Sequence, residues 1–192
     1  MGILIRIAKR EDSSYIAKAI LLALGMDLDN LEEESIWGEK CIMLFQNLAE
    51  REDSQYSYKN SFICEVDASV AGVLVAYDGA KLIQLRNALY DEISKMGLGE
   101  PKGLTDETES GEFYIDSLAV FEEYRGRGIA TKLIEEARTK ALSLNIERLG
   151  LLVDKENSNA AKLYTKLGFE YIEDKLFLGH KMEHMQKQVN IY

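Results

Sequence analysis

The sequence contains little that would indicate a disulfide-linked or metal-binding protein. Its 192 residues include only two cysteines, Cys41 and Cys64, which have neither the spacing of metal ligands nor the density of a disulfide scaffold. We therefore expect both to be buried or reduced thiols in a cytoplasmic protein. The two histidines, His180 and His184, have no nearby pattern of cysteines or carboxylates, so we predict packed or surface roles and no metal site.

Basic residues are also scarce. The chain has 23 Lys and Arg against 33 Asp and Glu, which gives a formal net charge of −10. A nucleic-acid-binding surface needs a basic face, so this balance argues against nucleic acid as a partner. The acidity is compatible with a cationic substrate, although it is equally a common solubility feature.

Long apolar runs are absent as well. None approaches the roughly 20 residues that a membrane-spanning helix requires, so we expect no membrane contact. Residues 1–7 lead directly into a strand-like alternation and lack the plan of a signal peptide. There are no internal repeats or low-complexity tracts, and the length suits a single domain over residues 1–192.

The most informative stretch is a predicted strand, glycine-containing loop and helix. Residues 113–120 are rich in β-branched and aromatic types, which predicts a strand, and apolar residues recur at helical spacing over 129–141. The loop between them is Arg125-Gly126-Arg127-Gly128. Glycine permits a tight turn and a close approach to a ligand, and N–H groups at a helix start favour an anion. This pattern predicts a phosphate or pyrophosphate site, although a plain strand-to-helix turn would produce it too.

Two motifs in this half of the chain resemble those of the GNAT N-acetyltransferases. Arg125-x-x-Gly128-x-Ala130 resembles that family's acetyl-CoA signature, and the run from Asn157 to Phe169, with a Leu-Tyr pair and a Gly-Phe, resembles its second signature. Two linked motifs are more specific than either one alone. The resemblance covers roughly residues 112–172, and the first hundred residues match only in general plan.

The resemblance implies an α/β (α+β) fold, the GNAT acyl-CoA N-acyltransferase fold, in which helices flank a central mixed, mostly antiparallel sheet. It also implies direct transfer of the acetyl group of acetyl-CoA to a primary amine of a small molecule or peptide in a ternary complex. The alternative is a non-catalytic acyl-CoA-binding regulatory or sensor module. A different phosphate-binding enzyme is a weaker alternative, because the loop lacks the Lys-Ser/Thr ending of a Walker sequence.

The same resemblance implies roles for individual residues. Tyr164 matches the family tyrosine near the departing thiolate and is the candidate general acid, although a structural tyrosine in a Leu-Tyr core pair would look the same. Asn157 is either a cofactor contact or an ordinary helix N-terminal residue. The residues implied to bind acetyl-CoA are Leu118, Ala119, Val120, Arg125, Gly126, Arg127, Gly128, Ile129, Ala130, Thr131, Asn157, Ala160 and Tyr164.

The general base is less well defined by the sequence. Strand alternation would place Glu112, Tyr114, Asp116 and Leu118 on one face of the central strand. Both carboxylates are therefore candidates to accept a proton from the amine, with Asp116 close to it and Glu112 at the mouth of the site. A hydrogen-bonded structural role is the alternative for each of them.

Outside the two motifs, periodicity predicts most elements. The glycine at position 72 suggests a bulge or a close backbone approach. Strands are expected at 3–7, 61–66, 70–77, 148–153, 171–178 and 181–188, and further helices at about 13–24, 36–51, 128–144 and 157–167.

An insertion follows the third expected strand, where a minimal family member would turn directly into the next one. Its first part, about 80–97, is predicted to be helical, and residues 97–111 are predicted to form a mobile loop. The insertion could be a lid or wall over the acceptor amine. Packing, or a contact in a homodimer, would explain it equally well.

An acidic segment, residues 26–53, precedes the second strand. It carries nine acids against one lysine and one arginine. In the resembled family this region lines the acceptor side, so an acidic rim there would attract a cationic amine. A solvated helix face with loop charges is the alternative.

Overall fold

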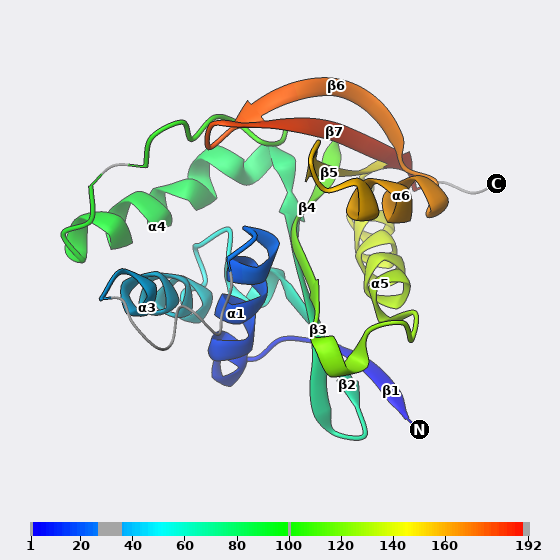
Figure 1. Ribbon diagram of the computed structural model, residues 1–192, viewed down its shortest axis with the longest axis horizontal. Coiled ribbons are helices and arrows are strands. Elements are labelled where there is room, and N and C mark those ends of the chain that lie inside the picture. Colours follow the sequence, from blue (N-terminus) through cyan, green and yellow to red (C-terminus); the bar gives the residue numbers. More distant parts are fainter. Residues whose placement is uncertain (1, 27–35, 100, 190–192) are drawn as a thin grey trace.

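The computed structural model describes residues 2–26, 36–99 and 101–189, which contain both strands and helices (Figure 1). The strands are β1 (Ile3–Ile7), β2 (Ser61–Val66), β3 (Ser69–Asp78), β4 (Glu112–Val120), β5 (Arg148–Asp154), β6 (Glu170–Phe177) and β7 (His180–Gln188). The helices are α1 (Ser13–Ala23), α3 (Ile36–Glu50), α4 (Leu82–Lys95), α5 (Ile129–Ser143) and α6 (Ser158–Lys166). Each element expected from the sequence is present, including the inserted helix, which is α4.

The strands form one sheet in the order β1-β2-β3-β4-β5-β7-β6. Neighbouring strands are antiparallel except β4 and β5, which run parallel, so the sheet is mixed and mostly antiparallel as predicted. The pairing of β4 with β5 ends at Ile115 and Leu151, although both strands continue beyond these residues. Backbone polar groups after this point have no ladder partner across the split and are available to a ligand.

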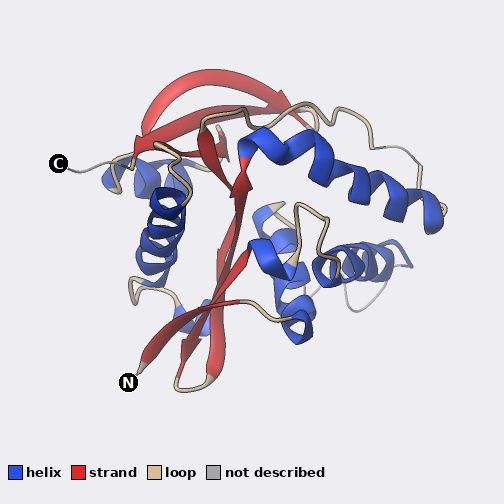
Figure 2. Cartoon of the chain, turned by 180° about the vertical axis from the view of Figure 1, so that it is seen from behind, coloured by secondary structure: helices blue, strands red, loops and turns tan. Residues whose placement is uncertain are grey.

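Helices cover both faces of the sheet (Figures 1 and 2). On one face α1 contacts β3 and β4, while α3 packs against α1 and α4 packs against α3. On the other face α5 contacts β2, β3 and β4, and α6 contacts β5. The predicted apolar face of α5 is buried, because Ile129, Leu133, Ala137 and Ala141 all lie in the core.

Gly72 on β3 allows the close backbone approach that the sequence suggested. A Cβ atom at this position would lie 2.9 Å from the carbonyl oxygen of Ala119 and 3.2 Å from Cγ2 of Ile129. A side chain there would therefore push β4 and the first turn of α5 away from β3. Because Gly72 has no side chain, β4 and the first turn of α5 can pack closely against β3, and both line the site described below.

The segment after α4 is anchored, whereas the sequence predicted a mobile loop. The Thr105 hydroxyl donates to the backbone oxygen of Leu176, and the backbone N–H of Leu178 donates to the oxygen of Gly103. Both contacts join the segment to the β6–β7 hairpin. The insertion therefore forms a wall that connects α4 with this hairpin.

Cys41 and Cys64 are buried free thiols, one in each of the two large apolar clusters. Among the described residues, the longest apolar helical stretches fall short of what a membrane crossing requires.

Candidate active site

The glycine loop forms one side of a cavity of about 500 Å³, named here the loop cavity. Gly126 and Gly128 have backbone φ angles of 75° and 73°, a left-handed conformation that glycine adopts without steric cost. Gly128 is the residue before the first turn of α5, whose leading N–H groups have no partner inside the helix. Their orientation and the helix dipole make this end of α5 suitable for an anion.

The loop cavity brings together most of the residues that the family resemblance assigned to acetyl-CoA. The lining residues include Leu118, Ala119, Val120, Arg125, Gly126, Gly128, Ile129, Ala130, Thr131, Ala160 and Tyr164. Two of the assigned residues, Arg127 and Asn157, do not line it. The Arg127 guanidinium lies over the ring of Tyr124, 5.5 Å from its centroid, and Asn157 caps α6 by accepting from the N–H of Ala160.

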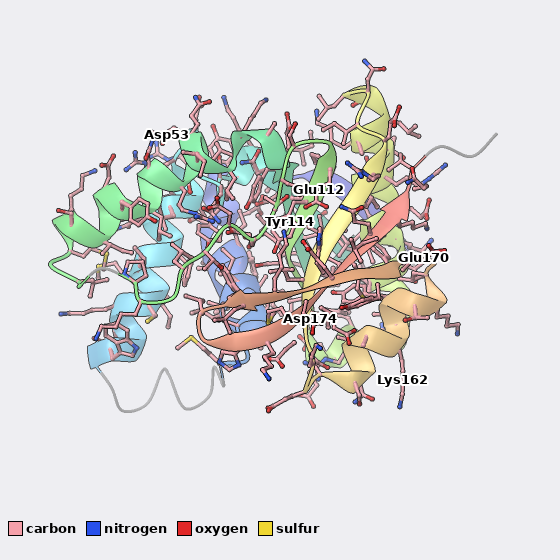
Figure 3. All side chains as sticks on the ribbon, turned by 90° about the horizontal axis from the view of Figure 1, so that it is seen from above. Asp53, Glu112, Tyr114, Lys162, Glu170 and Asp174 are labelled. Carbon is pink, nitrogen blue, oxygen red and sulfur yellow. The ribbon has the colours of Figure 1, made fainter. Side chains whose placement is uncertain are left out.

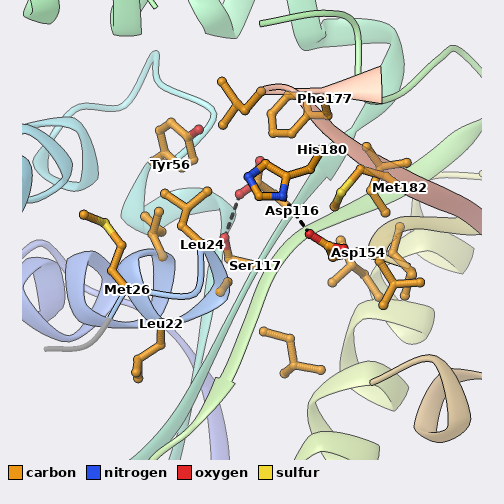
Figure 4. A pocket seen from close by; sticks show the side chains of 18 of the residues that line it. Leu22, Leu24, Met26, Tyr56, Asp116, Ser117, Asp154, Phe177, His180 and Met182 are labelled. Carbon is orange, nitrogen blue, oxygen red and sulfur yellow. Dashed lines mark hydrogen bonds and ion pairs between the residues drawn. The ribbon is translucent and has the colours of Figure 1, made fainter. Parts of the chain in front are cut away.

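A second cavity, of about 540 Å³, opens where β4 and β5 separate, and is named here the central cavity (Figure 4). Residues of both strands after the split line it, among them Ser117 of β4 and Val153 of β5. The two cavities share four lining residues: Leu22, Leu118, Ala160 and Tyr164. A ligand that runs from the glycine loop along the split would therefore reach the central cavity.

The wall of the central cavity is mainly apolar. Contributions come from α1 and its end, from α3 and α4, from the anchored insertion and from the β6–β7 hairpin. Representative apolar residues are Leu24, Met26, Phe45, Leu89, Leu104 and Phe177. Few polar side chains interrupt this surface, so each of them is a strong candidate for contact with a ligand.

Asp116 is the carboxylate at the split end of β4. It sits in a β-bulge, because Ile115 pairs with Ala76 while Ser117 pairs with the preceding residue, Val75. Its oxygens accept from the Ser117 hydroxyl at 2.8 Å and from the Gln55 amide at 3.4 Å. Burial raises the pKa of Asp116 to about 7, assisted by the negative charge of Glu107.

The bulge also changes which side chains share a face. Leu118 packs with Ile115 in the cluster beneath α5, whereas Tyr114 packs with Tyr77 on the opposite side of the sheet. The predicted common face of the central strand is therefore wrong beyond Asp116. Simple alternation fails here because the extra residue in the bulge shifts the period by one.

Glu112, labelled in Figure 3, lies at the paired end of β4. It lines neither cavity, contrary to its expected position at the mouth of the site. It is completely buried, and its oxygens accept from the Thr108 hydroxyl and the Gln186 amide and bond the His184 ring. These contacts hold the pKa of Glu112 below its ordinary value despite the opposing effect of burial. Its hydrogen bonds match the structural alternative.

Tyr164 lies on α6 and lines both cavities where they meet. Its ring packs edge-on against Phe169, with 5.7 Å between the centroids, and burial raises the pKa of the hydroxyl to about 12. The hydroxyl is therefore protonated at neutral pH and can serve as a proton donor. Asn157 lines the central cavity while it caps α6, so its position is compatible with both of its predicted roles.

Several polar residues at the site had no recognisable signal in the sequence. His180 and Asp154 both line the central cavity and form a 3.0 Å contact across the β5–β7 pair. Gln55 and Glu107 approach Asp116 from separate loops. For His180 the sequence predicted only a packed or surface role.

The predicted acidic rim finds no support among its described residues. Glu52 pairs with Lys59, Asp53 with Arg51, and Glu50 with Arg10, and the central cavity is lined by none of the four described acids of this segment. The remaining acids of the prediction, Asp27, Asp29, Glu32, Glu33 and Glu34, lie outside the described residues.

Comparisons with known proteins agree with this geometry. A solved structure described as an acetyltransferase is 34% identical, with a TM-score of 0.77, over 97% of this chain and 100% of that one. An acetyltransferase of Sodalis glossinidius is 30% identical over 49% of this chain and 64% of its own length. Spermidine N(1)-acetyltransferase of Escherichia coli is 36% identical over 37% of this chain and 40% of its own length.

The chain thus spans less than two thirds of the length of the curated relatives that it matches here. The family model for the acetyltransferase (GNAT) family matches residues 26–169, which include α3, α4, the split between β4 and β5, the glycine loop and α6. Because this match covers most of the chain, the protein belongs to the GNAT acetyltransferase family.

Proposed function

We propose that the protein transfers the acetyl group of acetyl-CoA to the primary amine of a small molecule or peptide by direct attack in a ternary complex. The observation that carries this proposal is the junction of the two cavities at Leu118, Ala160 and Tyr164, with Asp116 in the wall of the central cavity. One cavity suits the phosphates of a cofactor, and the other is large enough for an acceptor.

The loop cavity supplies the groups that acetyl-CoA requires. The N–H groups at the start of α5 would hold the pyrophosphate, and the unpaired edge of β4 after Ile115 would pair with the pantetheine and the acetyl carbonyl. Backbone N–H donors aimed at the carbonyl oxygen stabilise the oxyanion of acyl transfer. Acetyl-CoA would enter as a co-substrate and supply the thioester.

Asp116 is the proposed general base. An amine must lose a proton before it attacks, and an alkyl amine such as a lysine side chain has a pKa near ~10.4. A carboxylate with a pKa of about 7 is about half ionised at neutral pH, and its ionised form is more basic than an ordinary aspartate. Asp116 would take one proton from the ammonium, directly or through water, and leave the neutral amine in the cavity.

Tyr164 is the proposed general acid. The amine nitrogen forms a bond with the thioester carbon, and the carbon–sulfur bond breaks as the oxyanion collapses. The departing sulfur takes the Tyr164 hydroxyl proton, and the second nitrogen proton returns to the tyrosine or leaves to water. The products are the N-acetyl amine and free CoA thiol.

The central cavity favours an acceptor with an apolar body. Its walls are mainly aliphatic and aromatic, and none of the described acids of the acidic segment lines them. We therefore propose an amine carried by an apolar small molecule or by a peptide with an apolar first side chain. A polyamine such as spermidine, the substrate in one relative's name, would leave extra charges facing apolar walls.

A panel of amines separates these possibilities. The full chain would be incubated with acetyl-CoA and matched amines, namely an arylalkyl amine, an apolar N-terminal peptide, spermidine and a lysine-containing peptide. Free thiol and N-acetyl product would be measured together. We expect the highest kcat/KM for the apolar amines, whereas a clear preference for spermidine would contradict the proposed acceptor.

A further inference from the structure

The segment that follows α4 contributes a charged side chain to a buried network beside the central cavity. Glu107 is only 1% exposed, and its carboxylate bonds the guanidinium of Arg86, which comes from α4 and is itself 4% exposed. Arg86 also donates to Asp106 at 2.8 Å and to the backbone oxygen of Thr105 at 2.9 Å. One arginine therefore fixes three consecutive residues of the insertion.

The network continues from Glu107 toward Asp116. The other Glu107 oxygen accepts from the Tyr77 hydroxyl and from the Gln55 amide, both at 3.1 Å. The same Gln55 nitrogen donates to Asp116 at 3.4 Å. Because both carboxylates are acceptors, only the NH₂ end of the Gln55 amide can face them favourably.

We propose that Glu107 is a positioning residue for Asp116: held by Arg86, it orients the Asp116 carboxylate through Gln55 and places a negative charge beside it. The inference rests on the proposed role of Asp116 as the base. It would give the segment after α4 a role at the reaction site, because Glu107 belongs to that segment.

The energetics favour a functional reading of the Arg86–Glu107 pair. A buried ion pair gains little stability over apolar residues of similar size, because both charges must lose their water. Its effect on Asp116 is direct by contrast, since a negative neighbour makes a carboxylate harder to ionise. Glu107 raises the pKa of Asp116, while the Gln55 hydrogen bond and Arg86 lower it.

Three buried tyrosines close to Asp116 stay neutral. Tyr56 precedes β2, Tyr77 lies on β3 and Tyr114 on β4, and burial raises the pKa of all three well above the ordinary tyrosine value. The charged groups with the largest effects on Asp116 are Glu107 and Arg86. Asp154 and His180 are the other titratable residues of charged type that line the central cavity with Asp116, and they bond each other. Substitutions in the network should therefore move the titration of Asp116 in directions that can be stated in advance.

The test is a carbon-13 NMR titration of the Asp116 carboxyl in the full chain, without acetyl-CoA. Glu107→Gln removes the negative charge and should lower the Asp116 midpoint by about one pH unit. Gln55→Leu removes a hydrogen bond to the ionised form and should raise it. Glu92→Gln is the matched control, because Glu92 is also a buried carboxyl but lies on α4, where it bonds Asn47. This substitution should leave the Asp116 midpoint unchanged.

Opposite shifts in the two variants would support the inference, since a purely structural network would not produce them. An unchanged midpoint in folded Glu107→Gln, or shifts of the same sign, would overturn it. If Glu107→Gln does not fold, the Asp116 midpoint of Gln55→Leu is the deciding result. A higher midpoint supports the inference, and an unchanged midpoint overturns it.

The dependence of kcat/KM on pH, measured on the same variants, distinguishes the positioning role of Glu107 from the role of Asp116 as the base. The relevant part is the acid limb, where kcat/KM rises with pH. A limb that follows the NMR midpoint supports both. If the midpoint moves while the limb stays fixed, the positioning contact stands but Asp116 is not the base.

Discussion

The glycine loop and the N–H groups at the start of α5 form the proposed phosphate site, named here the cradle. Replacement of Gly128 tests this site at its centre. This residue precedes α5 with a φ angle of 73°, and a Cβ atom built on it would meet no other protein atom within 4 Å. A side chain there would therefore point into open space at the loop cavity without disturbing the core. Gly128→Ala adds a methyl group and backbone strain, and Gly128→Glu adds a negative charge as well.

The two substitutions have separable magnitudes. A non-glycine residue in the left-handed region costs about 1–2 kcal/mol of stability, which both variants should share. A carboxylate about 4 Å from a phosphate charge costs about 1 kcal/mol in water and about 4 kcal/mol near a protein surface. Gly128→Glu should therefore bind acetyl-CoA about 5- to 1,000-fold more weakly than Gly128→Ala.

Calorimetric titration with acetyl-CoA is the assay, and Gly97→Glu is the matched control. Gly97 follows α4 with a φ angle of 64° and open space around its Cβ position, and it does not line either cavity. Gly97→Glu introduces the same backbone strain and the same negative charge as Gly128→Glu, but away from the phosphate site. Its affinity for acetyl-CoA should therefore equal that of the unmodified protein. Equal affinities for all three variants would refute the cradle.

Three further substitutions test other parts of the site. Tyr164→Phe should lower kcat about 100-fold and leave the dissociation constant of acetyl-CoA nearly unchanged; equal turnover would remove its role as the acid. Asp116→Asn should lower kcat/KM about 100-fold at pH 8 and abolish its rise through pH 7, which is expected because a carboxylate with a pKa of about 7 is the active form only above that pH. Gly72→Ala should cost about 1–3 kcal/mol in urea unfolding, because its Cβ atom would lie 2.9 Å from the oxygen of Ala119. An unchanged unfolding midpoint would show that β3 and β4 can separate freely.

Asp116 also affects the dependence of stability on pH. Its pKa in the folded protein lies above the ordinary aspartate value, so the folded state binds more protons between about pH 4 and pH 7. Stability contributed by this group therefore decreases as the pH rises through that range. The base thus has a cost in stability at the pH where it would be active.

Local patterns predicted the elements well because each depends on short-range rules. The recurrence of apolar residues at every fourth position predicted the buried face of α5. The glycines of the loop predicted a tight turn before this helix, and the structure shows Gly126 and Gly128 in the left-handed conformation there. The inserted helix α4 was visible in the same way. Two motifs then indicated the family, and thus the sheet.

The errors have physical reasons that a local pattern cannot reveal. The bulge at Asp116 depends on how β3 pairs with β4, so alternation alone placed Leu118 on the wrong face. The loop after α4 has the composition of a mobile segment, yet Arg86 and the β6–β7 hairpin anchor it. Glu112 has the residue type of a base, but only the fold shows its oxygens bonded to Thr108, His184 and Gln186.

We propose that Asp116 and Tyr164 act in one reaction, the transfer of an acetyl group from acetyl-CoA to an apolar amine. The most direct measurement is the stoichiometry of that reaction, with free thiol and N-acetyl amine quantified in the same sample by mass spectrometry. We expect the unmodified chain to form equal amounts of both products, and Asp116→Asn to form much less of each. Thiol released without N-acetyl amine, or acetyl-CoA left intact with every apolar amine, would contradict it.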